Sequence, residues 1–510
     1  MIGAADPVRR NNYGLGMDNA TSRDTPGIGH RQMFIGGSWV DALDGGRFVT
    51  VNPATGAEIG SVPRGRAADV DRAVAAARNA FDSGRWGQSV AERDRARVLF
   101  RMADLVRERR DDLARLEVLD CGKPIGDAEA DIDEVAFMFE YYAGWATKIM
   151  GDIPPVGPDA MSLVVKEPVG VCGLIVPWNY PMLMAAQKVA PALAAGCTVV
   201  LKPAEQTPLS ALVMAEIAAE AGVPDAVFNV VTGVGVEAGE PMLTDPRVDK
   251  ISFTGSLAVG RHIQRTCADD LKRVTLELGG KSPNIVFADA PMPEAVSGSC
   301  LGVFGNQGEV CSAGSRVLVQ RSIHDEFVAA MVAETEAIRL GSGLDRSVTM
   351  GPLVSAAQME RVNGFIDSAP ADGARLVHAG RRPDDPVLAG GFFVPPMIFA
   401  VDDQRPRIAR EEIFGPVMTV IPFDDEAEAI RLAHDTEYGL AAAIWTTDIS
   451  RAMRTARALR AGVVWVNDSQ PAPSEAMWGG YKQSGVGREL GPYALGAYLE
   501  SKQIYINLGG

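Results

Sequence analysis

The chain has 510 residues, of which 47% are hydrophobic and 22% are charged, and the net charge is −16. This composition is typical of a globular protein and excludes a disordered or fibrous chain, and a prior of roughly 150 residues per domain predicts about three structural units. An acidic surface repels phosphate backbones and anionic lipids, so we expect neither nucleic acid nor a membrane as a partner.

The cysteines and histidines show no pattern that predicts a metal site. The six cysteines form no C-x-x-C pair, and the five histidines no H-E-x-x-H motif. We therefore expect neither a bound metal nor a disulfide framework. Residues 1–30 are polar and lack the apolar segment of a signal peptide, and no apolar run approaches the roughly 20 residues of a membrane helix. We predict a flexible N-terminal tail on a cytoplasmic protein.

The first elements after the tail are short strands and then amphipathic helices. Residues 33–40 and 48–51 predict the strands of an opening hairpin. From Ala67 to about Tyr142, apolar residues recur at helical spacing. A link rich in Pro and Gly follows at 151–159.

The next region alternates short β-rich runs with helices. One helix is predicted over Pro181–Ala195 and ends at Gly196, and another begins with Thr207 as N-cap and ends at Gly222. Such alternation indicates a parallel sheet with helices on both faces. The predicted strands lie at 171–176, 197–201, 227–231, 250–253 and 274–277.

Polar or Gly-rich segments follow the ends of these strands, for example Pro177-Trp178-Asn179 and Thr254-Gly255-Ser256. In open α/β sheets, ligands bind beyond the carboxyl ends of the strands, so these segments predict one composite site. A second α/β series follows, and the chain closes with a Gly-rich loop at 479–491 and an apolar strand at 503–508. The strands of the second series are predicted at 316–320, 417–423, 440–445 and 463–467.

Taken singly, the glycine motifs predict little. Residues 233–239 read G-x-G-x-x-x-G, one residue longer than the dinucleotide fingerprint, and a glycine turn is the better interpretation. Residues 255–260 open a helix after a strand, which would aim backbone N–H groups at an anion. The G-G-K-S at 279–282 is no P-loop, because Thr275 stands where that motif needs glycine.

Three residues lie in contexts that suit chemistry, although each also has an ordinary structural explanation. Cys311 lies among polar and Gly-rich residues, Glu277 ends a strand beside two glycines, and Asn179 occupies a loop tip. Cysteines usually pack inertly, a buried glutamate can be an ion-pair partner, and asparagine often forms turns. The residues alone leave both interpretations open.

Together, segments spread over about residues 33–508 resemble the aldehyde dehydrogenase superfamily, in the family's order and spacing. The resemblance implies an α/β fold with a Rossmann-like cofactor-binding domain, an α/β catalytic domain and a small β oligomerisation element. The matching segments are VPWNYP (176–181), KPAEQTP (202–208), FTGS (253–256), LELGGKSPNIVF (276–287), FGNQGEVC (304–311), EEIFGPV (411–417) and WGGYKQSGVGRELG (478–491).

The resemblance also implies domain boundaries and a small aldehyde as substrate. The NAD-binding domain would comprise 31–150 and 169–279, and the catalytic domain 280–484. Residues 151–168 and 485–510 would form the oligomerisation element of a homodimer or homotetramer.

The implied activity is oxidation of the aldehyde to the acid through a thiohemiacetal and a thioester. Cys311 would be the nucleophile, and the Asn179 amide with the Cys311 N–H would bind the oxyanion. Glu277 would activate the water that hydrolyses the thioester, in preference to transfer to coenzyme A. Lys188 and Glu489 match positions proposed to relay protons.

NAD is the implied cofactor. Lys202 and Glu205 match residues that bind the adenosine ribose, and Glu205 would repel the 2′-phosphate of NADP. Ala258 departs from the family, where many relatives carry glutamate. The implied cofactor-binding residues are Val176, Trp178, Lys202, Glu205, Gly235, Gly255, Ser256, Leu278, Glu412 and Phe414.

The substrate class stays open. Tyr180 and Trp478 match two aromatics that cage the ammonium group in betaine aldehyde and aminoaldehyde dehydrogenases, but two further cage positions carry Gln187 and Gly305. A cationic aldehyde and a general aromatic or aliphatic aldehyde are both candidates, and so is a non-catalytic NAD-binding relative. The predicted pocket residues are Tyr180, Gln187, Val310, Ser312, Ala472 and Trp478.

Overall fold

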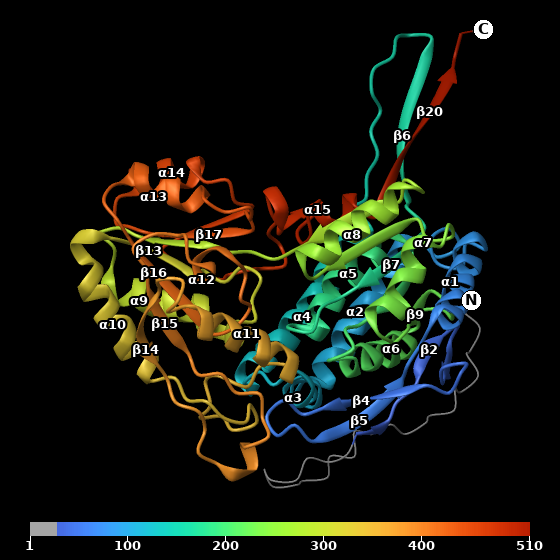
Figure 1. Cartoon of the computed structure of the whole chain (residues 1–510). Coiled ribbons are helices and arrows are strands. Elements are labelled where there is room, and N and C mark those ends of the chain that lie inside the picture. Colours follow the sequence, from blue (N-terminus) through green and yellow to red (C-terminus); the bar gives the residue numbers. More distant parts are fainter. Residues whose placement is uncertain (1–27, 510) are drawn as a thin grey trace.

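The structure is a computed structural model that describes residues 28–509, so residues 1–27 of the predicted tail lie outside the described residues. The last residues assigned to that tail form a short strand, β1 (Gly29–His30), which pairs in parallel with β5 (Glu58–Pro63). The body of the molecule has two lobes, each built on its own sheet, and a thin arm of two strands extends away from them (Figure 1).

The first lobe contains an eight-stranded sheet whose five central strands run parallel, as predicted. Its order is β19-β11-β10-β7-β8-β9-β2-β3. The strands are β2 (Met33–Ile35), β3 (Ser38–Val40), β7 (Val171–Ile175), β8 (Thr198–Lys202), β9 (Phe228–Val230), β10 (Lys250–Thr254), β11 (Arg273–Glu277) and β19 (Gly485–Val486).

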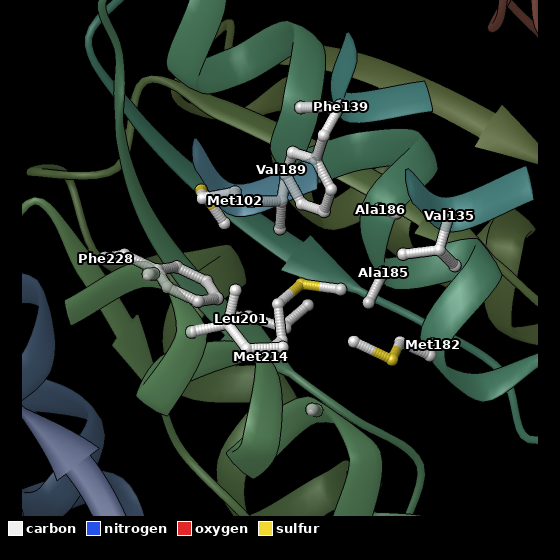
Figure 2. Close-up of a cluster of buried hydrophobic side chains, with 14 of the residues drawn as sticks. Met102, Val135, Phe139, Met182, Ala185, Ala186, Val189, Leu201, Met214 and Phe228 are labelled. Carbon is white, nitrogen blue, oxygen red and sulfur yellow. The ribbon is translucent and has the colours of Figure 1, made fainter. Parts of the chain in front are cut away.

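Helices bury both faces of this sheet, because side chains alternate between faces along each strand. Val199 and Leu201 of β8 join one hydrophobic cluster, and Val200 joins another. The first cluster is shown in Figure 2, where Phe139, Val189 and other side chains converge around Leu201. Its helices are α2 (Glu92–Glu108), α3 (Arg110–Cys121), α4 (Ile125–Ala146), α5 (Pro181–Ala195) and α6 (Leu209–Ala221), whereas α1 (Ala67–Asp82), α7 (Glu240–Thr244) and α8 (Leu257–Ala268) supply the other cluster.

Helix α5 has the predicted bounds, and Gly196 ends it in the left-handed conformation at φ 95°. The predicted start of α6 is wrong. Thr207 does not cap the helix, which begins at Leu209 after Pro208. Its first N–H is accepted instead by the carboxylate of Asp120, at 3.0 Å, which comes from α3 and could not be inferred from the local sequence.

The prediction of one opening hairpin from residues 33–40 and 48–51 is also wrong. β2 pairs with β3 across Gly36 and Gly37, whose φ angles of 65° and 88° suit the tight turn. The later segment is β4 (Arg47–Val51), which pairs with β5. Each segment therefore belongs to its own hairpin.

The second lobe contains a seven-stranded sheet in the order β14-β15-β16-β13-β12-β17-β18, parallel except between β14 and β15. The predicted strands at 316–320 and 417–423 are confirmed with their bounds. The strands are β12 (Pro283–Val286), β13 (Arg316–Gln320), β14 (Arg375–Ala379), β15 (Met397–Ala400), β16 (Val417–Phe423), β17 (Ala441–Trp445) and β18 (Val463–Val466), and the helices are α9 (Met292–Phe304), α10 (His324–Glu336), α11 (Ala356–Ser368), α12 (Arg407–Arg410), α13 (Glu426–His434) and α14 (Ile449–Ala458).

The arm consists of β6 (Ala160–Pro168) and β20 (Leu499–Asn507), which pair antiparallel over nine residues each. Figure 1 shows both strands projecting beyond α15 (Tyr493–Gly496). The terminal strand was predicted at 503–508, and pairing with β6 extends it back to Leu499. Within residues 28–509, no helix combines the length and the apolar character that crossing a bilayer requires.

Candidate active site

A cavity of about 550 Å³ lies where the strand ends of the first lobe meet the loop before β13 of the second. Residues 177–180, 254–256 and 277–279 line it, and they follow or end β7, β10 and β11. Residues 310–312 line it from the other lobe. Three of the five predicted strand-end segments therefore line one cavity, whereas those after β8 and β9 (202–205 and 232–233) are not part of its lining.

Most of the predicted site residues line this one cavity. The predicted residues that lie outside its lining are Lys188, Glu489, Val176, Lys202, Glu205 and Gly235. Those that line it are Asn179, Glu277 and Cys311 of the predicted catalytic set, Trp178, Gly255, Ser256, Leu278, Glu412 and Phe414 of the cofactor set, and Tyr180, Gln187, Val310, Ser312, Ala472 and Trp478 of the substrate set.

Among the cysteines of the described residues, Cys311 is the one whose exposure is intermediate, whereas the other five are buried. Asn179 is tied to the same loop, because its Nδ2 donates to the backbone oxygen of Glu309 at 2.8 Å. Burial, with the negative charges of Glu277 and Glu412, raises the pKa of Cys311 to about 12. The thiol in this arrangement is protonated at neutral pH and needs a base or a change of environment before it can react.

The carboxylate of Glu277 is buried at 3% exposure, and neither of its oxygens has a hydrogen-bond partner among the described residues. Burial raises its pKa well above the usual range, and the charge of Glu489 adds to the rise, whereas Lys188 and Arg488 oppose it. A buried, unpartnered carboxylate that faces a cavity is suited to accept a proton there.

Lys188 and Glu489 form a buried ion pair behind the cavity wall. The Nε2 of Gln187 also donates to Glu489, at 2.5 Å, and thereby joins this pair to the cavity lining. Ser252 of β10 donates to Glu489 at 2.9 Å and was not predicted, although a serine inside a strand expected to lie in a covered parallel sheet is a usable signal.

Two neighbouring glycines let the Glu412 loop and the Cys311 loop pack closely. A Cβ at Gly279 would lie 2.2 Å from Oε2 of Glu412, and one at Gly280 would lie 2.4 Å from the backbone oxygen of Cys311. The N–H of Gly280 donates to Glu412 at 3.1 Å. Burial nevertheless raises the pKa of Glu412 to about 7.

Helix α11 supplies two lining residues that were missed. Gln358 Nε2 donates to the backbone oxygen of Phe414 at 2.7 Å, and Arg361 Nη2 to that of Glu412 at 2.7 Å. They hold a loop in which Phe414 has a φ of 62°. Neither carries a sequence signal, because both lie in an ordinary amphipathic helix.

The first lobe offers a donor set that fits an anionic dinucleotide. Helix α8 begins at the cavity, and its N-cap Ser256 accepts from Val259 N–H at 3.4 Å, so the remaining N–H groups and the positive helix end face the lining. At the end of β8, the buried Lys202 lies 3.6 Å from Glu205, a half-buried carboxylate that can accept from hydroxyls.

The opposite end of the cavity combines aromatic and acidic groups. Lys123 forms an ion pair with Asp131, and its Nζ lies 4.1 Å from the centre of the Tyr180 ring. Glu134 accepts from the backbone N–H of Ser474 at 3.1 Å and has no ion-pair partner among residues 28–509. Asp131 and Glu134, both on α4, were not predicted as site residues, because the sequence of α4 is typical of a helix with one solvent-exposed face. The other missed lining residues here are Met138, Leu183, Met184, Gln470 and Leu490.

Comparisons with known proteins agree on one family. The model of the aldehyde dehydrogenase family matches residues 39–504. A putative aldehyde dehydrogenase, DhaS, of Bacillus subtilis (strain 168) is 47% identical over 94% of this chain and 96% of its own, and a betaine aldehyde dehydrogenase of the same organism is 46% identical over 93% and 97%. The solved structure of betaine aldehyde dehydrogenase from Staphylococcus aureus in complex with NAD⁺ aligns with a TM-score of 0.92 at 44% identity, over 94% of this chain and 95% of that one.

Proposed function

The chain belongs to the aldehyde dehydrogenase family, and we propose that it oxidises an aldehyde to the carboxylic acid with NAD, through a thioester on Cys311 that water hydrolyses. The observation that carries this proposal is the cavity shared by Cys311, Glu277 and Asn179, which come from two lobes and from three distant parts of the sequence. A thiol, an unpartnered carboxylate and an amide are the groups that the reaction requires.

NAD would occupy the part of the cavity at the start of α8 and extend beyond its lining to the end of β8. Lys202 and Glu205 would hold the adenosine ribose, and the start of α8 with Ser256 the phosphates. Glu412 and Phe414 would hold the nicotinamide ribose and ring. When bound, NAD supplies the acceptor for the hydride that leaves the substrate carbon. The remaining assigned contacts are Val176, Trp178, Gly235, Gly255 and Leu278.

The first step forms a bond between the sulfur of Cys311 and the carbonyl carbon of the aldehyde, after the thiol has given its proton to water and while the carbonyl π bond opens. The carbonyl oxygen becomes an oxyanion, which the Cys311 N–H and the Asn179 amide bind. The amide nitrogen has two hydrogens. One is directed at the Glu309 oxygen, so the other is available to the substrate.

Hydrolysis then uses Glu277. Its carboxylate takes a proton from water, the water oxygen attacks the thioester carbon, and the bond to Cys311 breaks to release the acid. Burial and the charge of Glu489 raise the pKa of Glu277. Glu277 can therefore act as a base only at a pH high enough for its carboxyl group to have lost its proton. Glu489 and Lys188 would pass the proton onward.

For the substrate, we propose an aldehyde that carries an amino or trimethylammonium group. The support is Glu134, a lining carboxylate with no cationic partner among the described residues, together with the aromatic rings of Tyr180 and Trp478. The second candidate is a neutral aromatic or aliphatic aldehyde. It is favoured by the apolar lining of Leu183 and Met184, and by Lys123, which already lies against the Tyr180 ring.

We also propose that the arm joins copies of the chain into a homodimer or homotetramer. Ile504, Tyr505 and Ile506 on β20 expose apolar side chains, which are seldom left in water on an isolated strand. The predicted oligomerisation element comprises residues 151–168 and 485–510, of which β6 and β20 form the arm, whereas β19 within it pairs with β11 of the first lobe. Light scattering should give the mass of two or four chains, and Ile504→Asp should lower it.

The decisive test of the activity is Cys311→Ala. We expect NADH formation with any aldehyde to be lost, while NAD still binds with its wild-type affinity in a calorimetric titration. Cys267→Ala is the matched control, because that buried thiol lies outside the lining, and it should keep its turnover. Turnover that survives the loss of Cys311 would contradict the mechanism, and a wild-type protein that binds NAD without turnover would favour the non-catalytic alternative.

A further inference from the structure

We propose that Asn306 is a positioning residue that aligns the amide of Asn179 with the nucleophile loop. This inference rests on the function proposed above, in which that amide binds the oxyanion. Asn306 does not line the cavity and would touch neither substrate nor cofactor. It would act only through the residues to which it donates.

The conformation around Asn306 is unusual. Asn306 and Gln307 have φ angles of 44° and 58°, and Gly308 follows at 73°, so three consecutive residues adopt the left-handed conformation. Such a conformation is strained for each non-glycine residue and persists only where the surroundings impose it. Asparagine tolerates it better than most residues.

The side chain of Asn306 explains what this turn achieves. Its Nδ2 donates to the backbone oxygen of Asn179 at 3.0 Å and to that of Glu309 at 3.4 Å. The Glu309 oxygen also accepts from the Asn179 amide at 2.8 Å. All three residues are at most 5% exposed. The two asparagines thus share one acceptor, two residues before Cys311.

This arrangement fixes both ends of Asn179. Asn306 holds its main chain at 3.0 Å, at an oxygen that the thiol of Cys121 also approaches at 3.7 Å, and the Glu309 oxygen orients its amide group. Because one amide hydrogen points at that oxygen, the direction of the other is determined, and it is the one assigned to the oxyanion. The loop is itself anchored to the second lobe, since Glu309 Oε1 accepts from Val354 N–H at 3.1 Å and Gln307 Oε1 from Gly351 N–H at 3.2 Å.

Three substitutions separate the hydrogen bonds from the backbone conformation. Asn306→Asp keeps the shape and the tolerance for positive φ but replaces the donor by an acceptor that faces two carbonyl oxygens. Asn306→Gly removes the side chain and relieves the backbone, and Asn306→Ala removes the side chain and leaves the strain. We expect kcat to fall roughly ten- to a hundredfold in all three, since a misplaced catalytic group costs rates of this order.

The readouts distinguish positioning from a loss of folded protein. Turnover is counted per NAD-binding site, and the dissociation constant for NAD and the rate of Cys311 alkylation should stay within twofold of the wild type. In Asn306→Asp, kcat relative to the wild type should recover as the pH falls, because a protonated carboxyl group donates again. Asn229→Ala is the control, because this buried asparagine bonds only to backbone groups remote from the cavity, and its kcat per site should be unchanged.

Wild-type kcat at pH 8 in Asn306→Asp or in Asn306→Gly would overturn the inference. If kcat were at the wild-type level in Asn306→Gly alone, the backbone conformation and not the side chain of Asn306 would matter, and the inference would again be rejected. If the wild-type protein itself produced no NADH from aldehydes, the proposed function would be wrong. If the wild-type protein were active and the Asn306 variants were equally active, only the inference about Asn306 would be wrong.

Discussion

Lys188 and Glu489 are 301 positions apart in the sequence, yet they form a buried ion pair in which Nζ lies 2.5 Å from Oε1. This pair sets the electrostatic environment of Glu277, because Glu489 raises the pKa of that carboxyl group and Lys188 lowers it. Gln187 and Ser252 also donate hydrogen bonds to the carboxylate of Glu489. The proposed base is therefore controlled by an ion pair that lies outside the cavity lining.

The first prediction concerns the pH dependence of turnover. Glu489→Gln removes a negative charge near Glu277 and leaves Lys188 without its partner, and both changes lower the pKa of Glu277. The acid limb of the kcat profile should therefore move to lower pH, even if the plateau falls because a relay group is lost. Steady-state rates between pH 5 and 10 check this, and a limb that stays in place or moves upward contradicts it.

The second prediction isolates hydrolysis. In Glu277→Gln, the thiol can still attack and NAD can still be reduced, but no carboxylate remains to activate water. A rapid burst of about one NADH per active site should be followed by slow turnover, and intact-mass spectrometry should find the acyl group on Cys311. A linear time course at the wild-type rate would remove Glu277 from the mechanism.

The third prediction concerns the choice of cofactor. Glu205 at the end of β8 would repel a 2′-phosphate, so Glu205→Gln should raise kcat/KM for NADP at least tenfold and lower that for NAD less. Glu220→Gln, which changes an exposed carboxylate paired with Arg109, is the matched control. If the ratio of kcat/KM for NAD to kcat/KM for NADP stayed unchanged, Glu205 would not be the residue that discriminates between the two cofactors.

The fourth prediction tests the substrate class with matched aldehydes. Betaine aldehyde and an aminoaldehyde are compared with neutral alkanals of similar length and with benzaldehyde by kcat/KM. Glu134→Gln should raise KM for the cationic aldehydes by about tenfold and leave KM for the neutral ones unchanged. Equal effects on both kinds would favour the neutral-aldehyde alternative, with Glu134 serving only its hydrogen bond to Ser474.

The fifth prediction concerns stability. Lys281 is 1% exposed, its Nζ has no hydrogen-bond partner among the described residues, and burial lowers its pKa to about 7. Above pH 7, the unfolded chain still holds a proton on this lysine that the folded protein has lost. Lys281 therefore makes the free energy of unfolding rise with pH, by at most about 1.4 kcal/mol per unit, up to the unfolded pKa of about 10.4.

Lys281→Met removes this contribution. Relative to the wild type, the variant should be most stable near pH 7 and lose that advantage as the pH rises to 9, measured as denaturant midpoints at each pH. Lys148→Met at an exposed position should show no such trend. Wild-type and Lys281→Met curves that run parallel over this range would mean that Lys281 titrates normally.

Much of the fold followed from local patterns. Helix α5 was predicted with its bounds because apolar spacing marks its length and Gly196 marks its end. One error came from a contact that the local sequence does not contain, since Asp120 of α3 replaces Thr207 at the start of α6. The other was a misreading of local pairing, because β2 pairs with β3 and β4 pairs with β5, the next strand along the chain in each case. A helix cap supplied by a distant helix depends on tertiary packing, which period and propensity do not record.

The sequence by itself determined the chemical groups of the site, the family likeness and the alternation that makes a parallel sheet, because these depend on residue type and on local stereochemistry. Only the tertiary structure decided which groups share the cavity. It added Glu134 and Arg361, placed Lys188 and Glu489 outside the lining, and revealed the contact between Asn306 and Asn179. The physical reason is that burial, charge neighbours and shared hydrogen-bond acceptors arise between segments more than a hundred residues apart, and these determine which carboxylate is free, which is paired and which is a base.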